Sequence, residues 1–280
     1  MSNYETTHRV SGPWSLRTCR RFWEEFAPFT LPSTSDDGLR TTFLSEHDWT
    51  PVDAVVTQDT DRARITVTGT GDLHAATDQV TRFLSLDIDA TAWPHVGDRD
   101  PVIAAAQRAL PGFRPCGFHS AYEAAAWAVL SQRTRVPTAA KLRRSLITEH
   151  GSNGAFPAPR TIHKAVTTGR LTLPARKPEF LAAVAEAALD GVLDSRSLRE
   201  LPEDDARNRL RAITGLGPFA ADLILVRGTN ATDILPRTEP RLLAEIERRY
   251  GIERSLDDLA TGWRPFRSWA AIHLRALSAA

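Results

Sequence analysis

The apolar positions in the first part of the chain recur at the spacing of short strands. Residues 41–44, 51–56 and 63–68 are rich in β-branched and apolar side chains, and in the last run these alternate with Arg and Thr, as in a strand buried on one face. A Gly- and Asp-containing break then precedes a helical pattern near residues 73–84. Residues 1–20 show no clear period and are expected to form an extension or a first irregular strand. The pattern predicts a small layer of strands covered by a helix.

Beyond a polar joint at residues 87–100, the periodicity becomes that of helices. Several apolar runs begin with Pro in the first turn, and Gly or Pro separates them. The expected helices cover residues 101–110, 120–132, 137–150, 160–166, 177–190, 203–212, 219–226, 240–250 and 265–279. We therefore expect an α+β protein, with a small N-terminal sheet-and-helix domain over residues 1–90 and a large all-helical domain over residues 91–280.

The charges divide the chain at the same place. The 280 residues carry a formal net charge of only +1, but residues 1–90 hold eight Lys and Arg against fourteen Asp and Glu, a net charge of −6. Residues 91–280 hold twenty-seven against twenty, a net charge of +7. Since a basic excess favours binding to nucleic acid, the helical half is the better candidate for contacting such a partner.

Composition excludes several classes of site. The two cysteines, Cys19 and Cys116, are too few for a disulfide framework, a cysteine zinc site or a four-cysteine iron–sulfur cluster. No apolar run approaches the length of a membrane span, and residues 1–14 lack the apolar segment of a signal peptide, so a cytoplasmic location is expected. No Gly-rich nucleotide loop, serine elbow or HExxH motif is present.

A Gly-x-Gly-Pro turn at residues 215–218 leads directly into an apolar helical run. Gly215 and Gly217 can adopt positive φ and let another backbone approach closely. Pro218 suits the first position of a helix, where its missing N–H costs nothing. The free N–H groups of such a turn, at the positive end of a helix, suit a phosphate.

Glu239 follows this turn by about the length of one helix and stands immediately before Pro240. Because Pro disfavours a helical conformation at the residue before it, Glu239 is expected to be the N-cap of a new helix, with Pro240 in its first position. A carboxylate is thereby placed at the start of a helix, close in sequence to a turn suited to phosphate.

Three ordered blocks resemble the motifs of the helix-hairpin-helix DNA glycosylases, and among these the bacterial 3-methyladenine DNA glycosylase II. The first is the glycine turn with the acid that follows it. The second, residues 263–269, is similar to the family's W-x-P-[WF]-R-S-[YW] ending. The third, residues 118–141, is similar to an apolar helix that ends in Gln before a small-residue helix. The resemblance covers residues 105–280 and implies a helix-hairpin-helix glycosylase domain, a TATA-binding-protein-like sheet in residues 1–90, and double-stranded DNA as the partner of a monomer.

The resemblance places Glu239 at the position of the family's catalytic acid, which is Asp in the family. A carboxylate there stabilises the oxocarbenium-like sugar that forms when the N-glycosidic bond breaks, and it can position water. The additional methylene of Glu moves the carboxylate by roughly 1–1.5 Å, and misplacement by about 1 Å can lower a rate on the order of a hundredfold. A working glutamate, a slow enzyme, a protein that has lost the chemistry, and a carboxylate that only starts a helix are all open.

Strand cleavage requires a residue that this chain lacks. In the bifunctional relatives, a lysine at the start of the second hairpin helix forms a Schiff base. The corresponding residue here is Phe219, with no lysine nearby. The resemblance therefore implies a monofunctional glycosylase, which removes a base without cutting the strand and requires no cofactor.

The resemblance also assigns DNA contacts to two turns. The hairpin would bind a phosphate through the residues Thr214, Gly215, Leu216, Gly217 and Pro218. The family often holds a structural monovalent cation, Na⁺ or K⁺, on three carbonyls of this turn, which correspond to Arg211, Ile213 and Leu216. A tight connection between two helices that binds no ligand is the alternative.

The second turn contains Gln132, Arg133 and Arg135. A protein that flips a base must fill the gap left in the stack. The family has an apolar wedge after the Gln, whereas this chain has Arg133, whose flat guanidinium can stack on bases. An ordinary phosphate-binding or solvated arginine is the alternative. The basic pairs at 143–144 and 176–177 are expected either to contact phosphates or to form solvated helix faces.

The expected base pocket departs from the family, whose members stack an electron-poor alkylated base on aromatic rings. The corresponding positions hold Phe219, Leu223 and Arg275. Aromatic surface could instead come from Trp127, Tyr122, Phe118 and Trp269, although ordinary core packing is the alternative for each. An Arg275 that faced the pocket would disfavour a positively charged base.

These features predict a monofunctional DNA glycosylase of base excision repair that acts on a flipped alkylated purine, with Glu239 in place of the family's Asp. The alternative is a catalytically weak or inactive DNA-binding protein that senses lesions on a glycosylase scaffold. An unrelated helical protein–protein module would require the three motif blocks to be coincidental.

Overall fold

The computed structural model describes residues 1–25, 28 and 38–277. Its N-terminal part is an antiparallel sheet of four strands, in the order β1-β4-β3-β2. The strands are β1 (Ser2–Arg9), β2 (Leu39–Leu44), β3 (Pro51–Asp59) and β4 (Arg62–Gly69). In β4 the apolar side chains are buried and the Arg and Thr side chains between them are more exposed, because successive residues of a strand point to opposite faces. The three strands and the α+β class that the sequence predicts are confirmed.

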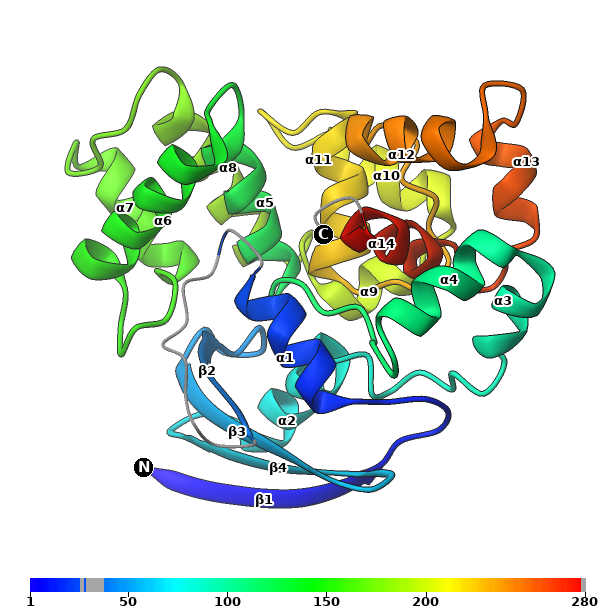
Figure 1. Ribbon diagram of the computed structural model, residues 1–280. Coiled ribbons are helices and arrows are strands. Elements are labelled where there is room, and N and C mark those ends of the chain that lie inside the picture. The colour runs from blue at the N-terminus through cyan, green and yellow to red at the C-terminus, as the bar shows by residue number, and fades with distance from the viewer. Residues whose placement is uncertain (26–27, 29–37, 278–280) are drawn as a thin grey trace.

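The first residues form an edge strand. β1 pairs with β4 along its whole length, from Ser2 opposite Gly69 to Arg9 opposite Arg62. Its sequence is mostly polar and has no run of apolar positions, which explains why the sequence alone predicts only an extension or an irregular strand. Two helices, α1 (Leu16–Glu24) and α2 (Leu73–Phe83), lie between the sheet and the rest of the molecule (Figure 1).

The remainder of the chain is helical (Figure 1). Its helices are α3 (Pro94–Arg99), α4 (Pro101–Ala109), α5 (Ala121–Ser131), α6 (Val136–His150), α7 (Pro159–Thr167), α8 (Lys177–Leu189), α9 (Ser195–Glu200), α10 (Glu203–Arg211), α11 (Pro218–Leu223), the π-helical η1 (Ile224–Gly228), α12 (Pro240–Tyr250), α13 (Leu256–Thr261) and α14 (Arg267–Leu277). All nine helices expected from the periodicity are present, and residues 278 and 279 of the last expected helix lie outside the described residues. The sequence analysis missed α1 and three helices of six residues, α3, α9 and α13.

One hydrophobic core continues from the sheet into the helical body. His119, just before α5, is surrounded by Trp23 of α1, Phe43 of β2 and Phe83 of α2, with ring centroids 5.5, 5.0 and 4.5 Å away. The Thr41 hydroxyl of β2 lies 2.7 Å from the imidazole Nε2. A second core lies among α3, α4, α12 and α14. The division into two domains at residue 90 stays a prediction, and the first core crosses it.

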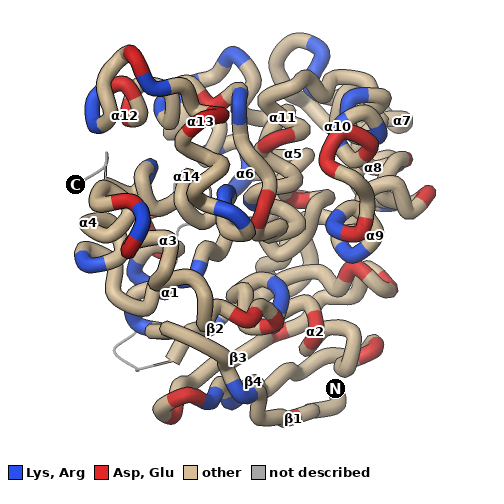
Figure 2. Tube along the Cα trace, turned by 90° about the vertical axis from the view of Figure 1, so that its right-hand side faces the viewer, with Lys and Arg blue, Asp and Glu red and all other residues tan. Residues whose placement is uncertain are grey.

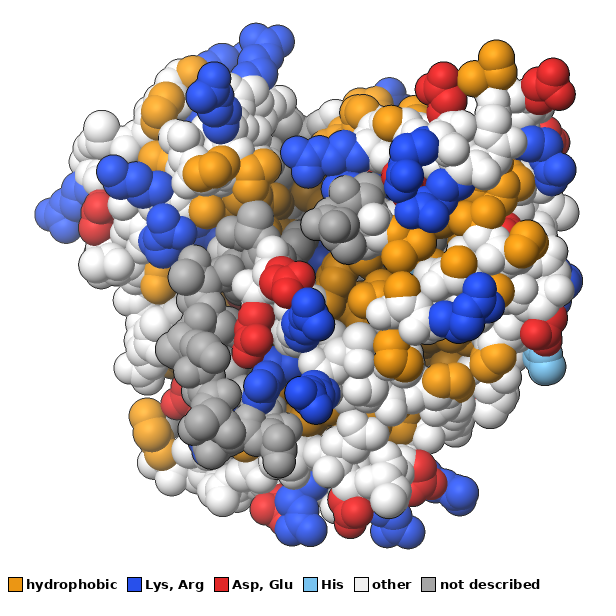
Figure 3. Space-filling model, in the orientation of Figure 1, with side chains coloured by type: hydrophobic (Ala, Val, Ile, Leu, Met, Phe, Trp, Pro, Cys, Tyr) orange, Lys and Arg blue, Asp and Glu red, His pale blue; other side chains and the backbone are white. Residues whose placement is uncertain are grey.

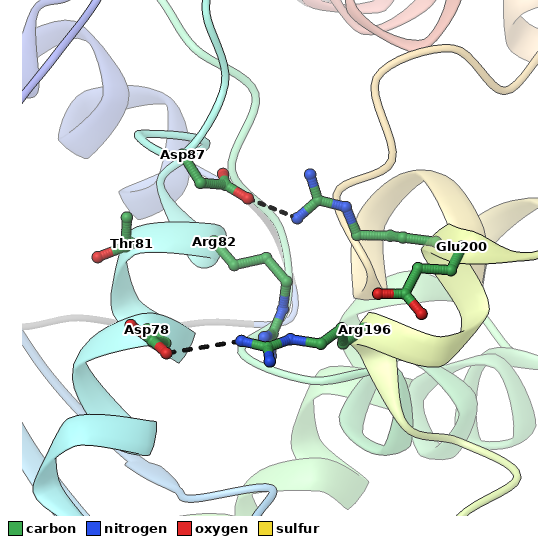
Figure 4. Close-up of a pocket in the computed structure, with 7 residues that line it drawn as sticks. Asp78, Thr81, Arg82, Asp87, Arg196 and Glu200 are labelled. Atoms are coloured by element: carbon green, nitrogen blue, oxygen red, sulfur yellow. Dashed lines mark hydrogen bonds and ion pairs between the residues drawn. The ribbon is translucent and has the colours of Figure 1, made fainter.

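Charged side chains also join the two parts. The carboxylate of Glu46, after β2, pairs with Arg82 of α2 and accepts hydrogen bonds from the Ser195 hydroxyl and the Ala121 N–H. Burial raises the pKa of this carboxyl, against the lowering effect of Arg82. Beside this contact, a cavity opens between α2 and α9 (Figure 4). It is lined by Asp78, Thr81, Arg82, Asp87, Arg196, Arg199 and Glu200. It contains none of the residues that the sequence analysis selects.

Candidate functional site

Glu239 is the N-cap of α12, as the sequence predicts. Its carboxylate accepts hydrogen bonds from the backbone N–H groups of Arg241 at 3.2 Å and Leu242 at 2.9 Å. The Nε of Arg275, on α14, lies 2.6 Å from the Glu239 Oε2. About a quarter of each of these two side chains is exposed, 23% for Glu239 and 28% for Arg275. The carboxylate is therefore held in one place but remains accessible to solvent.

The residue before Glu239 is held by a buried carboxylate. Asp222, on α11, accepts hydrogen bonds from both the backbone N–H and the hydroxyl of Thr238, at 3.2 and 2.8 Å. Its other oxygen lies 2.9 Å from the Nε of Arg207, on α10. Asp222 is only 3% exposed. The loop before Glu239 is thus attached to both hairpin helices. The sequence analysis did not select Asp222, although an acidic residue inside an apolar helical run could have identified it.

A network of ion pairs holds the earlier part of the same loop. Arg207 also pairs with Glu203 at 2.6 Å and donates to the carbonyl of Leu235 at 2.8 Å. Arg267, on α14, pairs with Glu203 at 2.9 Å and with Asp233 at 2.8 Å. Burial alone would raise the pKa of the Glu203 carboxyl, but the two guanidinium groups bring it below its ordinary value. These contacts connect α10, α14 and the loop before Glu239.

The glycine turn joins α10 to α11 and forms a helical hairpin. Gly215 has φ +92°, and a Cβ at this position would lie 2.4 Å from the ring of Phe180 on α8. Gly217 instead has φ −97°, so the expected positive φ applies to Gly215 alone. A Cβ on Gly217 would meet nothing within 4 Å. Pro218 is the first residue of α11, as the sequence predicts.

Within the described residues, the backbone N–H groups of Gly215 and Gly217 donate to no backbone carbonyl. The carbonyl of Ile213 accepts the N–H of Leu216 at 3.1 Å. The carbonyls of Arg211 and Leu216 accept no backbone N–H from the part of the chain that the structure describes. The turn thus offers N–H groups to an anion and carbonyls to a cation. Arg209 and Arg211, in the last turn of α10, add positive charge beside it. Figure 2 shows that α10 carries both acidic and basic positions.

The turn between α5 and α6 is the second candidate DNA contact. Gln132 is the C-cap of α5, and Arg135 is the N-cap of α6. Arg133 has φ +52°, a left-handed conformation that is uncommon for a residue other than Gly. All three side chains are exposed. Figure 3 shows Lys and Arg side chains on both upper lobes of the molecule, which are formed by α5–α8 on one side and α11–α12 on the other.

The pocket residues that the sequence analysis selects differ in how far they are buried. Tyr122 is 1% exposed, packs against Trp49 and Phe156, and donates its hydroxyl to the Pro157 carbonyl. Trp269 is likewise 1% exposed and packs in the second core. In both cases the ring is enclosed by protein, which corresponds to the core-packing alternative.

The other pocket candidates have more varied surroundings. Trp127 is 7% exposed and its ring centroid lies 6.5 Å from that of the fully buried Phe118. Phe219 is 44% exposed, and Leu223 is half-buried. Arg275 is the one pocket candidate for which the structure shows a direct contact with Glu239.

The sequence analysis missed a buried arginine near Arg275. Arg227 lies on η1, and its guanidinium is 5.1 Å from the ring centre of Phe22 on α1. Burial lowers the pKa of Arg227 to about 10, and the charge of Arg275 contributes in the same direction. π-Helical turns are frequent at functional sites. The apolar run of residues 219–226 gave no indication that the helix widens at this point.

Among the residues that the structure describes, no group of three or more His, Cys, Asp or Glu side chains could hold a metal ion. No helix within the described ranges is long and apolar enough to cross a membrane.

Comparison with known proteins identifies similar chains. No family model matches the sequence. A DNA-3-methyladenine glycosylase of Bacillus subtilis is 23% identical over 210 residues, which cover 70% of this chain and 69% of that protein. A protein of Mycobacterium tuberculosis named "Probable bifunctional transcriptional activator/DNA repair enzyme AlkA" is 29% identical over 216 residues. Those residues cover 72% of this chain and 42% of the mycobacterial protein.

Similar solved structures extend over nearly the whole chain. The 3-methyladenine DNA glycosylase of Archaeoglobus fulgidus superimposes with a TM-score of 0.74 at 19% identity and covers 98% of both chains. The 8-oxoguanine glycosylase/lyase of Clostridium acetobutylicum, solved with double-stranded DNA, has a TM-score of 0.66 at 13% identity, with 99% of this chain and 97% of that chain covered. The chain therefore has the fold of the helix-hairpin-helix DNA glycosylases, and in sequence it resembles the 3-methyladenine DNA glycosylases of that superfamily.

Proposed function

We propose that this protein is a monofunctional DNA glycosylase that removes an alkylated purine flipped out of double-stranded DNA. The observation that carries the proposal is the placement of Glu239. Its carboxylate stands at the N-terminus of α12, held by two backbone N–H groups and Arg275, and its loop is attached to the helical hairpin through Asp222. The names of the similar proteins in Bacillus subtilis and Archaeoglobus fulgidus support the class of substrate.

In the proposed reaction, Glu239 acts on the sugar of the flipped nucleotide. The bond between C1′ and the purine nitrogen breaks, and its electron pair leaves with the base. A purine alkylated at N3 or N7 carries positive charge in DNA, so it departs as a neutral base and needs no acid to protonate it. The Glu239 carboxylate stabilises the oxocarbenium-like sugar and positions the water that adds to C1′. The proton of that water passes to solvent.

The absence of strand cleavage rests on Phe219. This residue stands where the bifunctional enzymes have the Schiff-base lysine, it is 44% exposed, and its side chain has no amine. We therefore assign base removal without strand cleavage.

Two turns would hold the DNA. The hairpin residues Thr214–Pro218 would bind a phosphate through the N–H groups of the turn, and Gly217 leaves open space for it. The carbonyls of Arg211, Ile213 and Leu216 are the groups that would hold a Na⁺ or K⁺ ion there. The loop with Gln132, Arg133 and Arg135 would fill the gap that the flipped nucleotide leaves, since Arg133 is exposed and can stack on bases.

The test measures base release from methylated duplex DNA by the wild-type protein, Glu239→Gln and Glu239→Asp. We expect the wild type to release base and Glu239→Gln to lose at least about a hundredfold in rate, because the neutral amide cannot stabilise the sugar cation. Activity that appears only in Glu239→Asp would mean a retained pocket whose carboxylate lies out of reach. Undiminished release by Glu239→Gln would show that another residue performs the chemistry.

A second function is a non-catalytic protein that binds damaged or bent DNA. The contact between Arg275 and Glu239 favours it, because the guanidinium occupies the carboxylate that would act on the sugar. Arg133 in place of an apolar wedge favours it as well. If the wild type and Glu239→Asp both bound damaged duplex tightly but released no base, this second function would replace the first.

A further inference from the structure

Lys177 is a buried cation at the start of α8, far in sequence from the candidate catalytic residue. It is 6% exposed. Its position is unfavourable for its own helix, because the N-terminal end of a helix carries partial positive charge. Burial lowers the pKa of its ammonium group, because removal from water disfavours the charged form. The solvated helix face and the phosphate contact considered for this residue both require exposure, and the structure excludes them.

The ammonium group of Lys177 is satisfied by another helix. Its Nζ donates to the carbonyls of Val129 at 2.8 Å, Leu130 at 3.0 Å and Gln132 at 2.8 Å. These carbonyls lie at the C-terminal end of α5, where a helix lacks donors of its own and where partial negative charge favours a cation. A lysine has three N–H donors, and here all three are used.

This contact determines how α5 ends. Helices commonly end with a glycine in the left-handed conformation, which satisfies their last carbonyls. In this chain, the residue in the left-handed conformation is Arg133, with φ +52°, and the carbonyl of Gln132 just before it accepts hydrogen bonds from Lys177 and from the Thr134 hydroxyl. The lysine therefore holds the residue that precedes the exposed arginine.

The first turn of α8 also touches the helical hairpin. Phe180 follows Lys177 by three residues, so both lie on one side of the helix. The ring of Phe180 fills the space beside Gly215, where a Cβ would lie 2.4 Å from it. The guanidinium of Arg176 is 4.9 Å from the centre of the same ring. One turn of helix thus contacts both the loop at residues 132–135 and the turn at residues 213–217.

We propose that Lys177 is a positioning residue for base flipping: it fixes the loop at residues 132–135 so that Arg133 enters the gap left by the flipped nucleotide. Through Phe180, the same turn of α8 sets the separation between that loop and the hairpin that binds the phosphate. The inference rests on the proposed glycosylase function and adds to it a residue that touches neither the DNA base nor the sugar.

The test compares one alkylated base in two contexts, a fully paired duplex and a duplex in which the lesion lies in a run of mismatches. Only the first requires a gap in stacked, paired DNA to be filled. We expect Lys177→Met to lower the single-turnover release rate by about 100-fold on paired DNA and by less than about threefold on the mismatched duplex, since displacement of a positioned group by about 1 Å can cost that much. Lys164→Met, at an exposed lysine of α7, is the matched control and should change neither rate.

Two further measurements separate positioning from general damage. Arg133→Ala should lower the release rate on paired DNA by the same factor. Adding Lys177→Met to Arg133→Ala should lower it no further, because both changes prevent Arg133 from filling the gap. If Lys177→Met does not fold, Lys177→Arg is used, since it keeps the charge but cannot direct three donors from one atom, and it should show the same preference for mismatched DNA. Equal losses in both contexts, or no loss in either, would overturn the proposal.

Failure of the proposed function would be recognised separately. If the wild type releases no base from either duplex, unstacking is measured by the fluorescence of a 2-aminopurine next to the lesion. Fluorescence that rises with the wild type and Lys164→Met but not with Lys177→Met would support Lys177 as a positioning residue in a protein that flips bases without cleaving them. A rise with none of them, or with all three, would overturn it.

Discussion

At the scale of single residues, the carboxylate of Glu239 shares its charge among several partners. One oxygen accepts an N–H of α12, and the other lies between a second N–H and the guanidinium of Arg275. A sugar cation at C1′ would compete with Arg275 for the same carboxylate. Arg275 is 28% exposed, so water weakens its effect on other charges nearby.

Replacing Arg275 should change which bases are released. In Arg275→Met, the rate for a base that is cationic in DNA, such as 7-methylguanine, should rise about fivefold relative to a neutral one such as hypoxanthine, because a like-charge contact at a partly exposed site is worth about 1 kcal/mol. Single-turnover release from duplexes with one lesion measures this ratio. Arg241→Met, at an exposed residue of α12, is the control. An unchanged ratio in Arg275→Met would mean that its guanidinium does not face the base.

Thr238 is expected to act through the placement of Glu239. Thr238→Val removes the hydroxyl that binds Asp222 and should lower the single-turnover rate about tenfold, consistent with the sensitivity of catalysis to displacements of less than about 1 Å. Thr238→Ser keeps the hydroxyl and should restore the rate. DNA affinity, measured by fluorescence anisotropy, should be the same in all three proteins. A loss of affinity equal to the loss of rate would assign Thr238 to DNA binding instead.

At the scale of elements, the two glycines of the hairpin have different roles. Gly215→Ala should lower the free energy of unfolding by about 2 kcal/mol or more, because φ is +92° and the new Cβ would meet Phe180. Gly217→Ala should change it by less than about 0.5 kcal/mol, since its surroundings are open, yet it should weaken DNA binding by obstructing the phosphate. Urea unfolding and DNA titration give the two quantities. Tight DNA binding by Gly217→Ala would place the phosphate elsewhere.

Local patterns in the sequence predicted most elements correctly. The strands follow from alternation, and the helices from periodicity with Pro in the first turn. The helices α3, α9 and α13 have six residues each, too few to establish a period. Helix α1 buries only Leu16, Cys19 and Trp23 among many basic residues, so its apolar side is narrow.

The sequence predicted only those features of the candidate site that depend on neighbouring residues. Glu239 caps α12 because Pro240 follows it, and that relation can be read from two neighbouring residues. The contacts of Glu239 with Arg275, of Thr238 with Asp222 and of Lys177 with α5 join distant segments, and no spacing in the sequence reveals them. Tyr122 and Trp269 show the opposite case, since an aromatic residue on a helix can face a pocket or a core, and both face a core.

At the scale of the whole molecule, stability should depend on His273. This residue is fully buried in α14, with its Nδ1 2.8 Å from the Trp269 carbonyl and its ring against those of Trp93 and Phe113. Burial lowers its pKa from 6.5 to about 4. Above about pH 6.5 its contribution to stability is fully present. As the pH falls from 6.5 to 4, the unfolded chain takes up a proton that the folded protein does not, and stability decreases by up to about 3 kcal/mol.

His273→Leu should therefore reduce the loss of stability on the acid side. Between pH 7 and pH 4.5, the free energy of unfolding should fall less in His273→Leu than in the wild type, as measured by urea unfolding at each pH. If the free energy of unfolding fell as steeply with pH in His273→Leu as in the wild type, the acid sensitivity would be due to other groups.

The continuous first core has a consequence for the inheritance of this chain. Trp23, Phe43 and Phe83 come from the sheet-and-helix part, yet all three enclose His119, which introduces α5. A recombination event with its breakpoint near residue 90 would separate these partners. Each of the two fragments would then expose the apolar surface that packs around His119. We therefore expect that the N-terminal part cannot be exchanged as an independent module, and that substitutions around His119 on one side of residue 90 require compensating substitutions on the other.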